Sequence, residues 1–262
     1  MGRRHAVLPQ RRDQQGLTGM RYGIVSDVHS NHEALKAVIQ ELDEIGIDRL
    51  LCLGDIVGYG PNPNECCDLL RARECLAISG NHDEAAVSGS GANFFNSVAR
   101  EALVWTQGEL TAENRHYLSQ LPRERQFDGF DIVHGSPAQA FDYIMDVRDA
   151  KLAFESVSRP LTFVGHSHVA EVYYQDAAGG TFQQKLAHGG RIEVLPEYRY
   201  IINVGSVGQP RDRNPQASFA FYDDGARAVE IRRVQYDIKG VQERILRARL
   251  PRQLGERLAL GA

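Results

Sequence analysis

The first third of the chain alternates short apolar runs with amphipathic segments, and this alternation limits the fold more than any other feature. Strand-like runs lie at 21–26, 49–53 and 75–78. Between the first two, the apolar residues of 32–45 keep the spacing of one buried helix face, and Gly46 is a typical helix stop. A second helix is expected after Asn62, which is followed by Pro63. The order strand, helix, strand, helix, strand predicts a parallel sheet covered by helices.

The rest of the chain combines one helical region with a series of short strands. The segment 93–121 favours helix, with Thr111 as a cap, and the Arg- and Leu-rich tail at 238–260 predicts one amphipathic helix. After Pro122, short runs alternate apolar and polar residues between turns, which predicts a mostly antiparallel second half. These runs lie at 130–133, 161–164, 172–174, 191–195, 200–204, 219–222 and 229–234.

The composition argues against several classes of protein. The 262 residues carry a formal net charge of -4, whereas a dedicated nucleic-acid surface favours a basic excess. No run is apolar for long enough to span a bilayer, and the segment 1–19 lacks the apolar centre of a signal peptide. We therefore expect a cytoplasmic protein with a disordered segment at 1–19 and a single domain at 20–262. The oligomeric state stays open and includes a homo-oligomer.

Five of the predicted strands end in polar clusters, most of them beside a glycine. Ligands of α/β sheets gather at the carboxyl ends of the strands. Side chains two apart on an extended segment point the same way, so we expect Asp27 to converge with His29 and His166 with His168. Imidazole nitrogens and carboxylate oxygens without a thiolate suit manganese, iron, zinc, nickel or cobalt. The sequence therefore predicts a metal site drawn from these clusters, which contain Asp27 and His29, Asp55, Asn81 with His82 and Asp83, His134, and His166 and His168.

The order of these clusters is that of a known family. They read D-x-H at Asp27, G-D at Asp55, G-N-H-D at 80–83, H-G at His134 and G-H-x-H at 165–168. In this order they resemble the calcineurin-like metallophosphoesterase superfamily, and within it the compact bacterial and archaeal phosphodiesterase-like members. The resemblance implies an α/β fold, a four-layer α/β/β/α sandwich with mixed sheets and a binuclear metal site at the carboxyl ends of the strands.

The resemblance also implies how the metal ligands divide. Asp55 would bridge two divalent ions, with manganese as the first expectation and iron, zinc, nickel or cobalt as alternatives. The first ion would be held by Asp27, His29 and His168, and the second by Asn81, His134 and His166.

The same resemblance implies an activity. A hydroxide that bridges the two ions would attack phosphorus, and His82, oriented by Asp83, would protonate the leaving oxygen or stabilise its charge. The expected substrate is small and phosphorylated, a nucleotide-like phosphodiester or phosphoanhydride. The alternatives are an asymmetric dinucleoside-polyphosphate hydrolase, a phosphomonoesterase or protein phosphatase, and a non-catalytic scaffold on the same fold.

One departure from the protein phosphatases of this family bears on the substrate. After the G-D cluster the chain lacks their Asp-Arg-Gly, so the arginine with which they hold the substrate is missing. The Gly-rich loop 203–211 leads to Arg211 and Arg213, which suit a phosphate, although a solvated turn explains the loop equally well. Asn31 and Tyr59 lie beside predicted ligands and are candidates for substrate contact or for packing.

Overall fold

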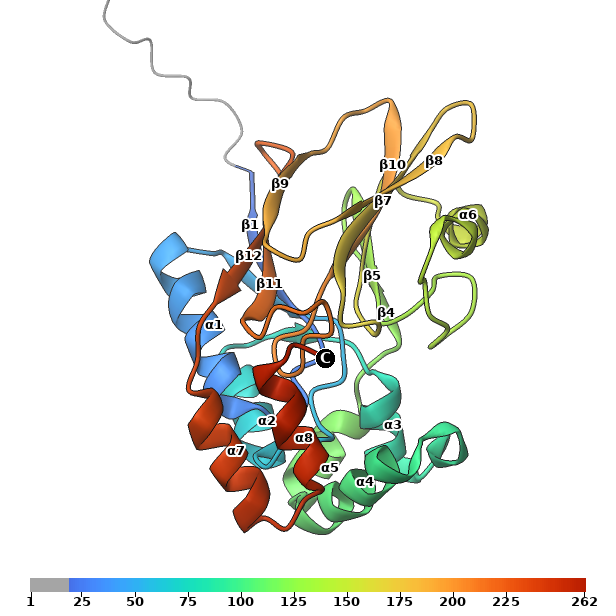
Figure 1. The fold of residues 1–262 in the computed structure, drawn as a ribbon. Helices are drawn as coiled ribbons and strands as arrows, with labels where there is room; N and C mark the ends of the chain where they lie inside the picture. The colour runs from blue at the N-terminus through green and yellow to red at the C-terminus, as the bar shows by residue number, and fades with distance from the viewer. Residues whose placement is uncertain (1–18) are drawn as a thin grey trace, which may run out of the picture.

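Two six-stranded sheets face each other at the centre of the molecule, and helices cover their outer faces (Figure 1). The computed structural model describes residues 19–262, so the segment 1–19 predicted to be disordered lies almost wholly outside the described residues. Helices α1 (His32–Ile45) and α2 (Pro63–Ala72) pack on one sheet, and α6 (Val147–Ser156) packs on the other. The predicted α/β/β/α architecture is confirmed.

The first sheet has the strand order β3-β2-β1-β11-β12-β9. Strands β1, β2 and β3 are parallel, as the first third of the sequence predicts, while β11, β12 and β9 join antiparallel. Parallel strands bring their carboxyl ends to one edge of a sheet, so the loops that follow them begin side by side. The strands are β1 (Arg21–Val25), β2 (Arg49–Cys52), β3 (Leu76–Ala77), β9 (Gly190–Glu193), β11 (Ala217–Asp223) and β12 (Ala228–Val234).

The second sheet has the strand order β4-β5-β6-β10-β7-β8. The second half of the chain is mostly antiparallel, as predicted, but β5, β6 and β10 are parallel. Strands β5 and β6 are parallel because α6 crosses over between them and returns the chain in the same direction. Strand β10 runs parallel to β6 because it follows β7, β8 and β9 and pairs antiparallel with β7. Strands β4 and β8 were not predicted, because they are short and largely polar. The strands are β4 (Glu124–Gln126), β5 (Phe130–Val133), β6 (Leu161–Val164), β7 (Ala170–Asp176), β8 (Thr181–Lys185) and β10 (Tyr198–Val204).

Two helical predictions have different outcomes. The segment 93–121 forms two helices, and Thr111 caps the second by accepting a backbone N–H at 3.2 Å. The single helix predicted at 238–260 is wrong. Arg249 adopts a left-handed φ of 56° and Pro251 cannot continue an α-helical hydrogen-bond ladder, so the tail divides into α7 and α8. The remaining helices are α3 (Asn81–Ser88), η1 (Ala92–Phe94), α4 (Ser97–Glu109), α5 (Ala112–Ser119), α7 (Ile238–Arg247), α8 (Arg252–Glu256) and η2 (Arg257–Ala259).

The helices of residues 19–262 include none with the length and apolarity needed to cross a membrane.

The main core lies between the two sheets and is rich in aromatic rings. Phe163 of β6 is fully buried there, with its ring centroid 5.6 Å from that of Phe130 and 5.5 Å from that of Tyr222. Phe130 and Phe163 belong to the second sheet and Tyr222 to the first, so these rings join the sheets face to face. The packing therefore fixes where the strand ends of one sheet lie relative to those of the other.

The Phe163→Ala variant is expected to lower the free energy of unfolding by about 3–5 kcal/mol, because it leaves a cavity between the sheets. The matched control is Phe94→Ala, whose ring is 93% exposed, and its loss should stay below about 0.5 kcal/mol. Urea denaturation followed by circular dichroism measures both. Equal losses would contradict the assignment of Phe163 to the joint between the sheets.

Candidate metal centre

Seven polar side chains from both sheets meet where the strands of the two sheets end, each shortly after the end of a strand. Six of them are buried and Asn81 is half-buried. Asp27 and His29 follow β1, Asp55 follows β2, Asn81 follows β3, His134 follows β5, and His166 and His168 follow β6.

The first group of ligand atoms contains Asp27, His29, Asp55 and His168. His168 Nε2 lies 3.2 Å from Asp27 Oδ1 and 3.1 Å from His29 Nε2. His29 Nε2 in turn lies 3.6 Å from Asp55 Oδ2. One ion could therefore contact two imidazole nitrogens and two carboxylates.

The second group contains Asp55, His134 and His166. His134 Nε2 lies 3.3 Å from Asp55 Oδ2 and 3.1 Å from His166 Nδ1. Asp55 thus belongs to both groups. Their membership matches the division that the family resemblance implies for these residues.

Backbone carbonyls hold three of the four imidazole rings. His29, His134 and His168 each turn Nδ1 toward a carbonyl oxygen, so Nδ1 carries a proton and Nε2 is the nitrogen that faces the site and would bind a metal. The acceptors are Val57 O at 3.2 Å for His29, Leu53 O at 2.7 Å for His134 and Gln209 O at 2.6 Å for His168.

Left-handed backbone turns, and not strand periodicity, aim the side chains. Asp27, His29, Asp55, His166 and His168 have φ values of 52°, 47°, 52°, 68° and 62°. The prediction that side chains two apart converge because they stand on extended segments is therefore wrong in its reason. His166 and His168 fall into different groups, a separation that the family resemblance implies and strand periodicity does not predict. Left-handed non-glycine residues cost on the order of 1–3 kcal/mol each and cluster at functional sites.

Glycines allow the ligand loops to approach each other closely. A Cβ on Gly80 would lie 2.1 Å from Asp55 Oδ1, and one on Gly165 would lie 1.9 Å from Ser26 Oγ. Both distances are far inside van der Waals contact, so no other residue fits without moving a ligand loop.

The site concentrates negative charge on its carboxylates. Burial lowers the pKa of His82 to about 4 and that of His166 to about 3, so both rings are neutral near pH 7. Burial also favours the neutral ring of His134, but the carboxylates of Asp55 and Asp27 outweigh it and raise the pKa of His134 to about 10. Carboxylates that draw a proton onto a neighbouring ring will equally favour a metal cation.

The donor atoms fit divalent metal ions. Asn81 Oδ1 is buried without a hydrogen-bond partner among the described residues, and such an oxygen is costly unless something binds it. His29 Nε2 and His168 Nε2 lie 3.1 Å apart while both Nδ1 atoms face carbonyls, so two lone pairs point at each other. A cation between them removes this repulsion. The mixed nitrogen and oxygen set suits manganese, iron, zinc, nickel or cobalt and does not distinguish among them.

The structure assigns Asp83 a different contact from the one expected. Its Oδ1 accepts from Val57 N at 3.1 Å and its Oδ2 from Gly80 N at 3.0 Å, so the carboxylate holds two ligand loops together and does not orient His82. Burial, followed by the charge of Asp55, raises the pKa of Asp83 to about 7. His82 Nδ1 is buried without a partner in the described part of the chain.

Aromatic rings hold His82 in place of a carboxylate. Phe95 stacks on the imidazole with the ring centroids 4.4 Å apart. The Tyr59 ring centroid lies 4.5 Å from that of His82, and Tyr59 also packs against the ring of His29. Tyr143 similarly stacks on His166 at 4.0 Å. Sequence analysis missed Phe95 and Tyr143, because neither belongs to a motif and both lie in irregular segments.

Of the four residues predicted to contact substrate, Asn31 uses both polar side-chain atoms in hydrogen bonds within the protein. Its Oδ1 caps α1 by accepting from Ala34 N at 3.1 Å, and its Nδ2 donates to Gly208 O at 2.9 Å. Tyr59 lines the site, and Arg211 lies next to it with Cζ 5.8 Å from the ring centroid. Arg213 is exposed.

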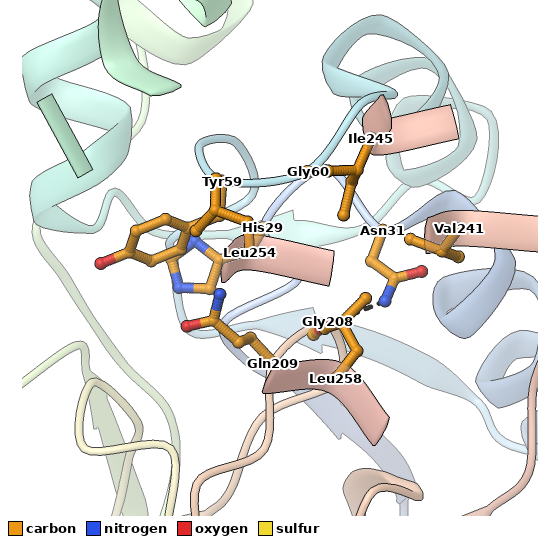
Figure 2. Close-up of a pocket in the computed structure, with 10 residues that line it drawn as sticks. All are labelled: His29, Asn31, Tyr59, Gly60, Gly208, Gln209, Val241, Ile245, Leu254 and Leu258. Atoms are coloured by element: carbon orange, nitrogen blue, oxygen red, sulfur yellow. Dashed lines mark hydrogen bonds between the residues drawn. The ribbon is translucent and has the colours of Figure 1, made fainter. Parts of the chain in front are cut away.

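A small cavity lies beside His29, between the ligand loops and the C-terminal helices (Figure 2). Tyr59 and Gln209 line it on the side of the metal centre, and Leu254 and Leu258 face them from the tail. The tail therefore forms one wall of the functional site, a role the sequence alone left open.

The chain resembles known proteins over most of its length. The family model for the calcineurin-like phosphoesterase superfamily domain matches residues 20–225. An uncharacterised protein of Methanocaldococcus jannaschii is 40% identical over 245 residues, which cover 91% of this chain and 97% of that protein. The crystal structure of a metallophosphoesterase from Sphaerobacter thermophilus has a TM-score of 0.81 and 40% identity, covering 93% of this chain and all (100%) of that one. A hypothetical protein from Pyrococcus horikoshii shares the fold, with a TM-score of 0.73, 24% identity and coverages of 92% and 98%.

The Gly80→Ala variant is expected to bind less than half of the wild-type metal, because its Cβ would displace the Asp55 carboxylate. The matched control is Gly108→Ala in α4, where a Cβ meets nothing within 4 Å. That control should keep its metal and gain up to about 1 kcal/mol of stability from better helix propensity. Elemental analysis after reconstitution and dialysis measures the metal content. Full metal occupancy in Gly80→Ala would contradict the inference that metal binding depends on the position of the Asp55 carboxylate.

Proposed function

The chain belongs to the calcineurin-like phosphoesterase superfamily, and we propose that it is a two-metal phosphodiesterase acting on a small, nucleotide-like phosphodiester or phosphoanhydride. The observation that supports this most directly is Asp55, whose carboxylate is shared by two buried groups of potential metal ligands. Two ions that share a carboxylate lie close enough to act on a single phosphate group.

Each residue of the centre has a role in this proposal. Bound ions would supply Lewis-acid charge to the phosphate and lower the pKa of a water. Manganese is the first expectation, followed by iron, zinc, nickel or cobalt. The first ion would be held by Asp27, His29, Asp55 and His168, and the second by Asp55, Asn81, His134 and His166.

His82 is the residue we propose to act at the leaving group. Its backbone N–H donates to Asp55 Oδ1 at 2.8 Å, which ties its position to the shared ligand. Because its pKa of about 4 leaves the ring neutral at pH 7, His82 would donate a hydrogen bond from a neutral N–H to the departing oxygen. Charge that develops on that oxygen would be stabilised in a site that excludes water.

A scaffold without activity is the less favoured alternative. Such a protein has no need of a neutral, buried histidine beside a complete set of ligands. The choice among diester, anhydride and monoester substrates, the single domain at 20–262 and the cytoplasmic location stay predictions.

The His82→Ala variant is expected to lower kcat for bis-p-nitrophenyl phosphate by about 10²–10⁴-fold while it keeps its metal, since the group that assists the leaving oxygen is gone. Asp55→Asn should lose metal and activity together. The control is His116→Ala, which changes an exposed ring on α5 and should behave as wild type. Assays use metal-stripped protein reconstituted with Mn²⁺, Ni²⁺, Zn²⁺ or Mg²⁺. If no metal supports hydrolysis of this diester, a monoester or a dinucleoside analogue, the scaffold becomes the better interpretation.

Replacement of Phe95 by Leu should lower kcat by about tenfold with little change in KM, because the stacked ring that orients His82 is lost. Phe95→Tyr should restore most of the rate. The neighbouring Phe94, with its ring 93% exposed, provides the control Phe94→Leu. Steady-state kinetics of the four proteins test this, and equal rates in Phe95→Leu and Phe94→Leu would count against a positioning role.

A further inference from the structure

The Gly-rich loop 203–211 is a sequence motif that neither the metal ligands nor the proposed function account for. Its sequence suits a phosphate cradle or a solvated turn, and the structure contradicts the solvated turn, because all of the loop but its last residue is buried. Val207 N donates to Ser26 O at 2.9 Å. Gly208 N donates to Asp27 O at 2.9 Å. These two amides are therefore satisfied within the protein and are not free for a phosphate.

The loop is joined closely to the backbone that carries Asp27. Ser206 is fully buried, and its Oγ donates to Asp27 O at 2.8 Å and accepts from Gln209 N at 2.8 Å. The two backbones also approach each other at Gly208, where a Cβ would lie 1.9 Å from Val28 O. Only glycine fits at this distance without moving one of the two segments. The position of Asp27 therefore depends on the position of the loop.

The far end of the same loop holds His168. Gln209 O accepts from His168 Nδ1 at 2.6 Å, and Arg211 N donates to His168 O at 3.1 Å. Asp212 follows directly, and its Oδ2 accepts from Ala170 N at 3.3 Å. Both the imidazole and the backbone of His168 are therefore held by this part of the chain.

A buried ion pair anchors this end of the loop to the first sheet. The side chains of Asp212 and Arg233 are 3% and 4% exposed, and Arg233 on β12 donates to both carboxylate oxygens of Asp212. Arg233 Nη1 also donates to Gln216 O at 3.3 Å. A buried ion pair is costly to break, because either partner would be left as an unpaired charge. The loop is thus fixed at one end to Asp27 and at the other end to β12.

The contacts of residues 206–212 reach the first group of ligands and not the second. Asp27 and His168 both belong to the first group. Within the described part of the chain, no hydrogen bond of residues 206–212 reaches His134 or His166, which belong to the second group. Because the groups that hold a ligand in place influence metal affinity, a disturbed loop should act on one ion.

His166 has anchors of its own. Its N–H donates to Asp27 Oδ2 at 3.0 Å. In addition, Gly165 N donates to His134 O at 2.8 Å, and Gly165 O accepts from Asn203 Nδ2 at 2.6 Å. Neither of these two bonds involves residues 206–212, so His166 stays attached to the second sheet when that segment shifts.

We propose that residues 206–212 position Asp27 and His168 for the first ion and thereby set its affinity separately from that of the second ion. They are positioning residues, which hold ligands and bind no metal themselves. This inference rests on the proposed function, because it requires two ions. It adds that the two ions can be lost one at a time.

The Ser206→Ala variant is expected to weaken binding of the first Mn²⁺ about tenfold or more and to leave the second unchanged, because Asp27 is held less firmly. The matched control is Ser218→Ala, another fully buried serine, whose hydroxyl donates to Val204 O at 2.7 Å and not to a ligand loop. Both variants lose a buried hydrogen bond, so urea denaturation should show similar losses of stability. Only Ser206→Ala should lose metal affinity. Isothermal titration of metal-stripped protein with Mn²⁺ measures the affinities.

The Gly208→Ala variant disturbs the loop through a different contact, since its Cβ would collide with Val28 O. Wild type should retain two Mn²⁺ per chain after dialysis, and Gly208→Ala about one. Asn81→Ala should also retain about one, because Asn81 Oδ1 is a candidate ligand of the second ion. The double variant should retain neither ion. Elemental analysis of the four proteins therefore shows whether the two changes remove different ions.

The proposal is overturned if Ser206→Ala binds both ions as wild type does, or if Ser218→Ala loses the same affinity. It is equally overturned if Gly208→Ala loses both ions to the same extent, or if the double variant keeps one. Wild type that binds fewer than two ions overturns the two-metal function and this proposal with it. Two ions in wild type with no difference among the variants overturn the positioning role alone. Selective loss of the first ion in a protein that hydrolyses no phosphoester would sink the proposed activity and leave the positioning role standing.

Discussion

The candidate site depends on one buried carboxylate, that of Asp55. Its Oδ1 accepts the His82 N–H at 2.8 Å, and its Oδ2 lies 3.3 Å from His134 Nε2 and 3.6 Å from His29 Nε2. An ionised carboxylate with 1% exposure is tolerated only where donors or opposite charges surround it. His29, His82 and His134 follow β1, β3 and β5, which belong to both sheets. The two sheets must therefore pack correctly before the Asp55 carboxylate has its partners.

The stiffness of the two-sheet core explains how the strained loops persist. Asp27, Asp55 and His166 sit in left-handed conformations that a short peptide would leave. Rings such as Phe163 and Tyr222 join the two sheets whose strands lead into these loops. The core therefore supplies the stability that holds the ligands in a costly but preorganised arrangement.

The molecule divides its tasks between two parts of the chain. The part matched by the family model carries the seven candidate metal ligands, while apolar side chains of the C-terminal helices line the cavity beside His29. The tail therefore packs against the ligand loops without supplying a ligand from the groups described above.

Local patterns in the sequence predicted a helix-covered parallel sheet, a mostly antiparallel second half and the polar residues at the strand ends, because strand periodicity and short motifs are local properties. The four-layer arrangement was predicted only through the resemblance of those motifs to a known family. The sequence also indicated three helix ends, at Gly46 after α1, Asn62 before α2 and Thr111 before α5. Only the tertiary structure turned Asp83 and Asn31 toward backbone groups and divided the tail at Pro251. These outcomes depend on which backbone amides and carbonyls of distant segments come within hydrogen-bond reach. No local pattern encodes that information, because it exists only once the two sheets have packed.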